Sequence, residues 1–315
     1  MDALTQFLAS APQQLILGLS LGSLYALIAV GYTVVYGIVQ LINFAHGEVF
    51  MIGAFGALST YLLLFKGTTS IWVLPVMILG AMAMAVLTAV VMERVAYRPL
   101  RGAPRLAPLI TAIGISVFLQ EFVRLFYGDI PGMPDAKSRI PFPLIEGVTG
   151  RPIPMFGLQL QRPALFTIAC LVVCGLFLWW FITRTKSGRA MQAVSQDPDT
   201  ARLMGINVDR IIVIAFAIGA ALAAVAGVAQ GLQNNNIDFR MGFMAGLKAF
   251  TAAVLGGIGN VPGAIVGGLT LGVVETFAAM YISSSWKDII AFSLLILVLV
   301  FRPQGLLGAR VVDRA

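Results

Sequence analysis

The chain has 315 residues, of which 59% are hydrophobic and only 11% are charged, and its mean hydropathy is +0.91. This composition lies well outside that of soluble domains and is typical of an integral membrane protein. The net charge of +7 comes from basic residues dispersed at the ends of apolar runs, without a dense basic run, so no nucleic-acid partner is expected.

Apolar runs that could cross a lipid bilayer follow one another along the chain, because a spanning helix needs about 20 mostly apolar residues. The runs at 15–36, 72–92, 163–182, 211–230 and 289–301 qualify or nearly do, and shorter or glycine-interrupted runs lie at 49–65, 107–126, 244–255 and 261–281. They lack the alternation of a transmembrane β-barrel. The sequence predicts an all-α polytopic membrane protein with about eight or nine spans, some broken or re-entrant, in one domain over residues 1–315.

A polar stretch interrupts the apolar run between residues 15 and 65. It contains Asn43, His46, Gly47 and Glu48, and His46 is the only histidine of the chain. Backbone groups freed by a helix break inside a membrane need partners, and we expect Asn43 and Glu48 to supply them along a transport pathway. His46 is expected to be a neutral hydrogen-bonding histidine, because nothing else in the chain forms a proton relay with it.

Basic residues predict the orientation of the chain. They are enriched in the segments 94–105 and 184–210 and in the tail 302–314, which are therefore expected to be cytoplasmic. The segment 127–162 is rich in proline and glycine and mixes both signs of charge. It is predicted to be a folded external loop in the periplasm.

Glycine is the second signal of irregular helices. Pairs four residues apart, such as Gly18 with Gly22 and Gly268 with Gly272, let helices approach closely. A cluster that interrupts the helix near residue 260 has two readings, a wall or gate of the pathway or a tight turn between helices. Its members are Gly256, Gly257, Gly259, Asn260 and Pro262.

Glu275 is the clearest carboxylate in the middle of a predicted span. Ionisable groups inside spans either bind ions or pair with neighbouring helices, and a hydrogen bond to a neighbouring helix is the expected case here. A single carboxylate gives little support for transport that is coupled to an ion gradient.

Motifs for nucleotide binding and for a zinc site are missing from the sequence. No Gly-Lys dipeptide occurs, so there is no Walker A loop and the chain is not expected to hydrolyse ATP. A single histidine without a cysteine cluster gives no zinc site of the usual kind. We predict no catalytic residue, no metal site and no cofactor, so the chain is expected not to be an enzyme.

Five stretches of the sequence carry a further signal, namely 22–55, 93–101, 205–210, 242–268 and 294–308. They closely resemble, in the same order along the chain, permease subunits of bacterial branched-chain amino-acid ABC importers of the LivH type. The likeness is weakest over about 128–162. The resemblance implies an ABC importer permease fold in the bacterial inner membrane. It also implies as partners a second permease, two ATP-binding cassette subunits and a periplasmic amino-acid-binding protein.

The resemblance gives the segment 184–210 a role. Importer permeases of this kind carry an E-A-A-x-x-x-G element that docks on the ATPase, and Asp199, Thr200, Ala201 and Gly205 form a degenerate version of it. Arg202 is expected to be exposed, and Leu203 and Met204 to be apolar anchors between a helix start at Asp197 or Asp199 and a helix end at Gly205.

Two alternatives to branched-chain amino-acid import remain at this point. Relatives of the same family serve urea and short amides, and no residue of the sequence reads out an aliphatic side chain. The other alternative is a self-sufficient channel or ion-coupled carrier, in which Glu275 and the segment 127–162 belong to the pathway.

Overall fold

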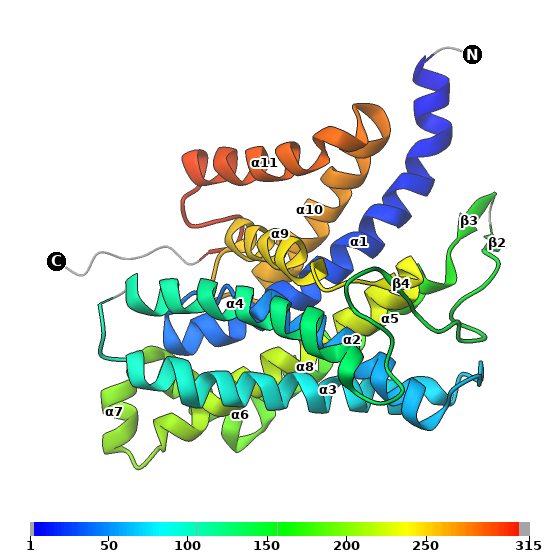
Figure 1. The fold of residues 1–315 in the computed structure, drawn as a ribbon. Helices are drawn as coiled ribbons and strands as arrows, with labels where there is room; N and C mark the ends of the chain where they lie inside the picture. Colours follow the sequence, from blue (N-terminus) through cyan, green and yellow to red (C-terminus); the bar gives the residue numbers. More distant parts are fainter. Residues whose placement is uncertain (1–2, 105, 156, 309–315) are drawn as a thin grey trace.

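The computed structural model describes residues 3–104, 106–155 and 157–308, and helices dominate it (Figure 1). The α-helices are α1 (Ala3–Val39), α2 (His46–Leu64), α3 (Val73–Met92), α4 (Leu106–Phe126), α5 (Arg162–Arg184), α6 (Lys186–Gln196), α7 (Pro198–Leu203), α8 (Val208–Asn234), α9 (Met241–Gly256), α10 (Val261–Tyr281) and α11 (Lys287–Phe301). Short strands are β1 (Ile140–Pro141), β2 (Ile153–Met155), β3 (Leu158–Leu160) and β4 (Asn236–Ile237). Single turns of other helix types are η1 (Glu93–Tyr97), η2 (Arg98–Leu100), η3 (Tyr127–Asp129) and η4 (Ser284–Trp286).

Eight helices of the described chain are long and apolar enough to cross a membrane. They include α1 to α5, α8, α10 and the final helix α11, while α9 is apolar but shorter, with 16 residues. The prediction of eight or nine spans is confirmed, and with it the all-α membrane class.

The segment 127–162 lies at one end of the helices, which we call the strand end. There β1 pairs antiparallel with β4, directly after α8. The hydroxyl of Thr69, in the turn between α2 and α3, donates a hydrogen bond to Oε1 of Glu146 at 2.7 Å. Gln13 near the start of α1 donates to the carbonyl of Gln159 in β3 at 2.8 Å. The beginning of α1 is therefore at the strand end.

The segments 94–104 and 184–210 lie at the opposite end, which we call the α6–α7 end because these two helices protrude there (Figure 1). Asp209, in the first turn of α8, forms ion pairs with Arg98 at 2.8 Å and with Arg101. The described C-terminal residues return to this end, because the amide of Leu307 donates to the carbonyl of Gly256 at 3.0 Å. Arg105 and the tail residues Arg310 and Arg314 lie outside the described residues.

Glycines hold the interior helices close together. A Cβ atom at Gly22 of α1 would lie 2.7 Å from the Cα of Leu269 on α10, and one at Gly268 would lie 2.6 Å from the Cα of Ala26. The glycine pairs of the sequence are thus contact points between helices. The pattern Gly18-Leu19-Ser20-Leu21-Gly22 also matches G-x-S-x-G, but it lies inside a continuous helix rather than at the strand-to-helix turn of a hydrolase nucleophile.

The outer helices present apolar side chains to the surroundings. In α11 the only buried residue is Ala291, and α5 exposes Val173, Leu176 and Trp179 among others. Apolar surfaces of this extent mark contacts with lipid or with another protein. They agree with a multi-pass membrane protein.

Candidate functional site

The polar stretch 43–48 forms the end of a turn between α1 and α2 and the start of α2. The turn occupies residues 40–45 and includes Gln40 with a φ of 52°, while Gly37 lies inside α1 and Gly47 inside α2. The residue before α2 is Ala45, whose side chain makes no capping bond. The expectation that Asn43 and Glu48 satisfy freed backbone groups is wrong, because both side chains bond to other side chains.

Asn43 and Glu48 tie this turn to two distant elements. The hydroxyl of Tyr97, at the end of η1, donates to Oδ1 of Asn43 at 2.6 Å. Ser116 and Gln120 of α4 donate to Oε1 of Glu48 at 3.0 and 2.6 Å. Residues four apart lie on one helix face, which is why both α4 side chains reach the same oxygen.

His46 is buried against the ring of Tyr32. The ring centroids of His46 and Tyr32 are 4.7 Å apart in an edge-on arrangement. Nε2 of His46 has no hydrogen-bond partner among the described residues, and it lies against Gly31. Gly47, next in sequence, packs on α9, where a Cβ atom at Gly246 would lie 2.8 Å from the Cα of Gly47.

The glycine cluster near residue 260 forms the turn between α9 and α10. Gly257 and Gly259 have φ values of 106° and 90°, which side chains rarely adopt. The side-chain amide of Asn260 donates a hydrogen bond to the carbonyl of Leu307 at 2.7 Å. Gly259, Asn260 and Pro262 also line an apolar cavity of about 590 Å³ shared with α1, α5 and α6. A role of this turn in the pathway remains a prediction.

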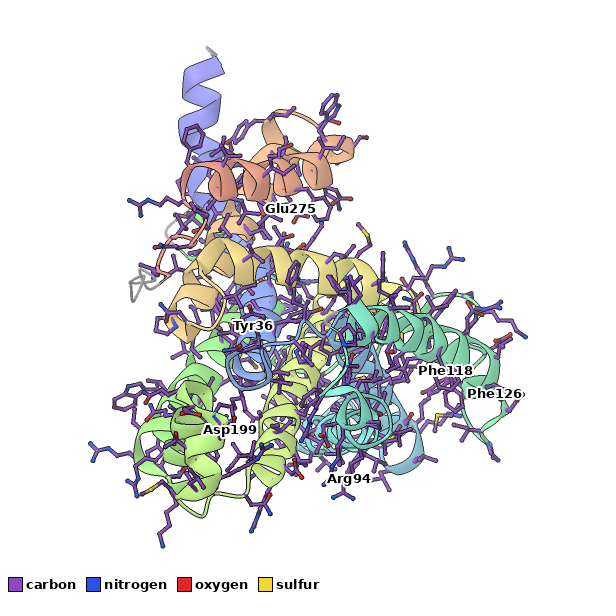
Figure 2. The ribbon with its side chains drawn as sticks, turned by 90° about the vertical axis from the view of Figure 1, so that its left-hand side faces the viewer. Tyr36, Arg94, Phe118, Phe126, Asp199 and Glu275 are labelled. Atoms are coloured by element: carbon purple, nitrogen blue, oxygen red, sulfur yellow. The ribbon has the colours of Figure 1, made fainter. Side chains whose placement is uncertain are left out.

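Glu275 of α10 is bonded to two neighbouring helices. Its Oε1 accepts from Nζ of Lys248 on α9 at 2.6 Å, and its Oε2 accepts from the hydroxyl of Tyr25 on α1 at 2.9 Å. Lys248 also contacts Oδ1 of Asp288 at 2.7 Å. Figure 2 shows Glu275 among α9 to α11, far from Asp199.

The predicted coupling residues are in and just after α7. The side chain of Asp197 caps this helix by accepting from the amides of Asp199 and Thr200 at 3.0 and 3.1 Å. The hydroxyl of Thr200, together with these amides, holds the pKa of the Asp197 carboxyl below its usual range. The carboxylate is therefore charged at neutral pH, as the positive end of a helix favours.

A glycine ends α7. The amide of Ile206 bonds to the carbonyl of Ala201, and the amide of Gly205 to that of Arg202, both at 3.0 Å. These two bonds form a Schellman motif, in which Gly205 has the required positive φ of 82°. Ala201 faces inward, whereas Leu203 and Met204 are 88% and 78% exposed. Arg202 pairs with Asp199 at 3.1 Å on the surface.

Two parts of these sites were not predicted from the sequence. Tyr97, Ser116 and Gln120 gave no local signal, because each bonds a residue at least 54 positions away. Lys248 did give one, since a lysine inside the apolar run 241–256 needs a counter-charge within reach.

Residues 14–299 match the family model described as branched-chain amino acid transport system / permease component. The chain is 49% identical over 311 residues to the branched-chain amino acid permease BraD of Pseudomonas aeruginosa, covering 96% of this chain and 97% of that protein. It is 43% identical over 308 residues to LivH of Escherichia coli, with the same coverage of 96% and 97%.

A solved structure shares the fold. It is described as an inward-facing conformation of a metal-chelate type ABC transporter, and the TM-score is 0.50 at 16% sequence identity. The match covers 96% of this chain and 91% of the other. The likeness therefore extends over nearly the whole arrangement of helices.

Proposed function

Because the chain belongs to the family of branched-chain amino acid transport system permease components, we propose that it is the permease subunit of an ATP-driven importer. It moves leucine, isoleucine and valine across the bacterial inner membrane. The relatives named for these substrates favour them over the urea and short-amide alternative.

The observation that carries the coupling role is the exposure of Leu203 and Met204. Apolar side chains that protrude from an aqueous segment are stabilised when a partner covers them. The sequence has no phosphate-binding loop, so ATP hydrolysis requires a separate subunit. We infer that α7 inserts into a groove of that subunit and that the residues 184–210 form a cytoplasmic coupling loop.

The remaining partners follow from the same proposal. Two ATP-binding cassette subunits dock at the α6–α7 end, and a second permease completes the pathway against part of the exposed apolar surface. A periplasmic amino-acid-binding protein delivers substrate at the strand end, where residues 127–162 form the external loop. Two groups of residues border the pathway between these ends, namely Asn43, His46, Gly47 and Glu48 and the turn at Gly256, Gly257, Gly259, Asn260 and Pro262.

The proposal is tested by purification and transport. The tagged chain, expressed with the genes adjacent to its own, should retain ATP-hydrolysing subunits, and proteoliposomes of the complex with binding protein should accumulate labelled leucine only with ATP inside. Leucine accumulation by the chain reconstituted alone would instead support a self-sufficient carrier. Omitting ATP provides the control for passive leak.

A further inference from the structure

A second cavity, of about 800 Å³, opens among α1, α8, α9 and α10 at the strand end. This volume lies in the range of small-molecule sites, and polar and charged side chains make up most of the lining. Residues 137–139 of the segment 127–162 form part of its rim. The cavity is separate from the polar stretch 43–48 and from α7.

The floor of this cavity is a buried ion pair. Lys248 and Glu275 both line it, although their residues are only 6% and 3% exposed. Tyr25 lies beside them, with its hydroxyl on Glu275 and the face of its ring 5.8 Å from Nζ of Lys248. Charges this deep in a membrane protein are expensive, so a pair that borders an accessible cavity points to a ligand.

Both members of the pair have hydrogen-bonding capacity to spare. An ammonium group has three N–H donors, and Lys248 directs its contacts to Glu275 and Asp288. A carboxylate offers about four acceptor positions, and Glu275 uses one on each oxygen, for Lys248 and Tyr25. One donor of Lys248 and two acceptor positions of Glu275 are left for a bound molecule.

The remaining lining residues suit the carboxylate and the aliphatic side chain of an amino acid. The rim is basic, with Lys137, Arg139, Arg240 and Lys287 against the single acid Asp238. Such a rim attracts a carboxylate from solution. Leu21, Leu24 and Met244 provide apolar wall between rim and floor. The cavity thus has a positive rim, a floor that carries one positive and one negative group, and an apolar wall. These features match an amino-acid zwitterion with an aliphatic side chain.

We propose that this cavity is a binding site for the amino-acid zwitterion within the permease itself. The α-carboxylate binds Lys248, the α-ammonium binds Glu275, and the aliphatic side chain packs on Leu21, Leu24 and Met244. Charge-assisted bonds at both ends replace the water lost from the zwitterion. This inference rests on the proposed function and places substrate recognition in this chain, after release from the binding protein.

The test measures binding of labelled leucine to the purified transport complex in lipid nanodiscs, without binding protein. Wild type should bind leucine saturably. The double variant Lys248→Gln/Glu275→Gln should bind about tenfold more weakly or less, because two charge-assisted hydrogen bonds are lost. Lys66→Gln is the matched control, because Lys66 is an exposed lysine between α2 and α3 and should bind leucine as wild type does.

A second variant keeps the test decisive where the charge variant fails to assemble. Met244→Trp narrows the cavity without touching the ion pair, and it should assemble and lose leucine binding. Two analogues test the two ends of the ligand. The acid 4-methylpentanoate lacks the ammonium group and 3-methylbutylamine lacks the carboxylate, and each should compete about tenfold more weakly than leucine.

Several results would overturn the inference. They are the absence of saturable leucine binding to wild type, unchanged binding in the assembled variants, or equal competition by either analogue. Leucine uptake by the complete system separates this failure from that of the function. If wild type and the assembled cavity variants take up leucine at equal rates, the binding-site inference is wrong and the proposed import function is still supported. No uptake by the complete wild-type system removes both.

Discussion

The hydroxyl of Tyr97 reaches Oδ1 of Asn43 at 2.6 Å, and both residues are almost completely buried. This bond joins the π-helical extension of α3 to the turn between α1 and α2. We expect Tyr97→Phe to lower the stability of the folded permease by about 1–3 kcal/mol, because it leaves a buried acceptor without its donor. Thermal unfolding monitored by size-exclusion fluorescence measures the change. Tyr61→Phe is the control, since its hydroxyl accepts only an exposed bond from Gly67, and an equal loss in both variants would contradict the prediction.

Glu48→Leu should reduce the amount of assembled permease more strongly than it alters transport per assembled complex. The substitution leaves the side chains of Ser116 and Gln120 without their shared acceptor in the protein interior. Glu48→Gln keeps an acceptor oxygen and should restore most of the yield. Glu121→Leu is the control and should have little effect, because the side chain of Glu121 is 45% exposed and pairs with Arg124 three residues along the same helix. Quantitative blots of membranes, together with uptake rates, distinguish a loss of assembled permease from a loss of transport per assembled complex.

His46→Gln should leave the pH dependence of uptake unchanged over roughly pH 5 to 8, the range in which an unperturbed histidine changes charge. Glutamine retains hydrogen-bonding groups, and we expect its flexible side chain to pack beside Tyr32, whose ring His46 contacts edge-on. Uptake is measured against pH and divided by the amount of assembled complex. Normal assembly with loss of a pH-dependent limb would show that the histidine carries protons.

Gly205→Val and Arg202→Glu should uncouple transport while the protein inserts normally. Valine disfavours the positive φ that ends α7, and the charge reversal gives like charges at positions 199 and 202. The readouts are leucine uptake and ATPase stimulation by loaded binding protein. Gly205→Asn and Arg202→Lys serve as controls, because asparagine tolerates the positive φ at position 205 and lysine keeps the positive charge beside Asp199. Wild-type uptake in both test variants would remove α7 from the coupling mechanism.

Gly22→Val should destabilise the crossing of α1 and α10 by roughly 1–3 kcal/mol or more, since the backbones cannot separate without opening the interior. Its Cβ atom would lie 2.7 Å from the Cα of Leu269. Gly114→Val in α4 has open space at the Cβ position and should be tolerated. Comparable melting temperatures for the two variants would show that the close approach contributes little.

Hydropathy alone predicts most of the helices, because each span must satisfy its backbone internally and present apolar side chains. The boundaries within the run 15–65 were harder to predict. Gly37 and Gly47 are strong breakers in water, yet both lie inside helices, and Gly47 does so because α9 approaches it closely. Only Gln40 takes the positive φ in that turn.

The pairing of polar side chains could not be predicted from sequence spacing. Glu48 finds its partners 68 and 72 residues away, and Lys248 finds Glu275 on the next helix only because the turn at Gly257 folds α10 back along α9. In contrast, the cap at Asp197 and the glycine ending at Gly205 are local features, and the sequence predicted both.

Helix α8 contacts other elements at both of its ends. Asp209 in its first turn forms ion pairs with Arg98 and Arg101, and β4, directly after its last turn, pairs with β1. Its 27 residues span about 40 Å as one unbroken rod. A displacement applied at the α6–α7 end would therefore be carried along this continuous helix to the strand end. In the proposed importer, opening on one side of the bilayer and closing on the other would then be coupled within a single subunit.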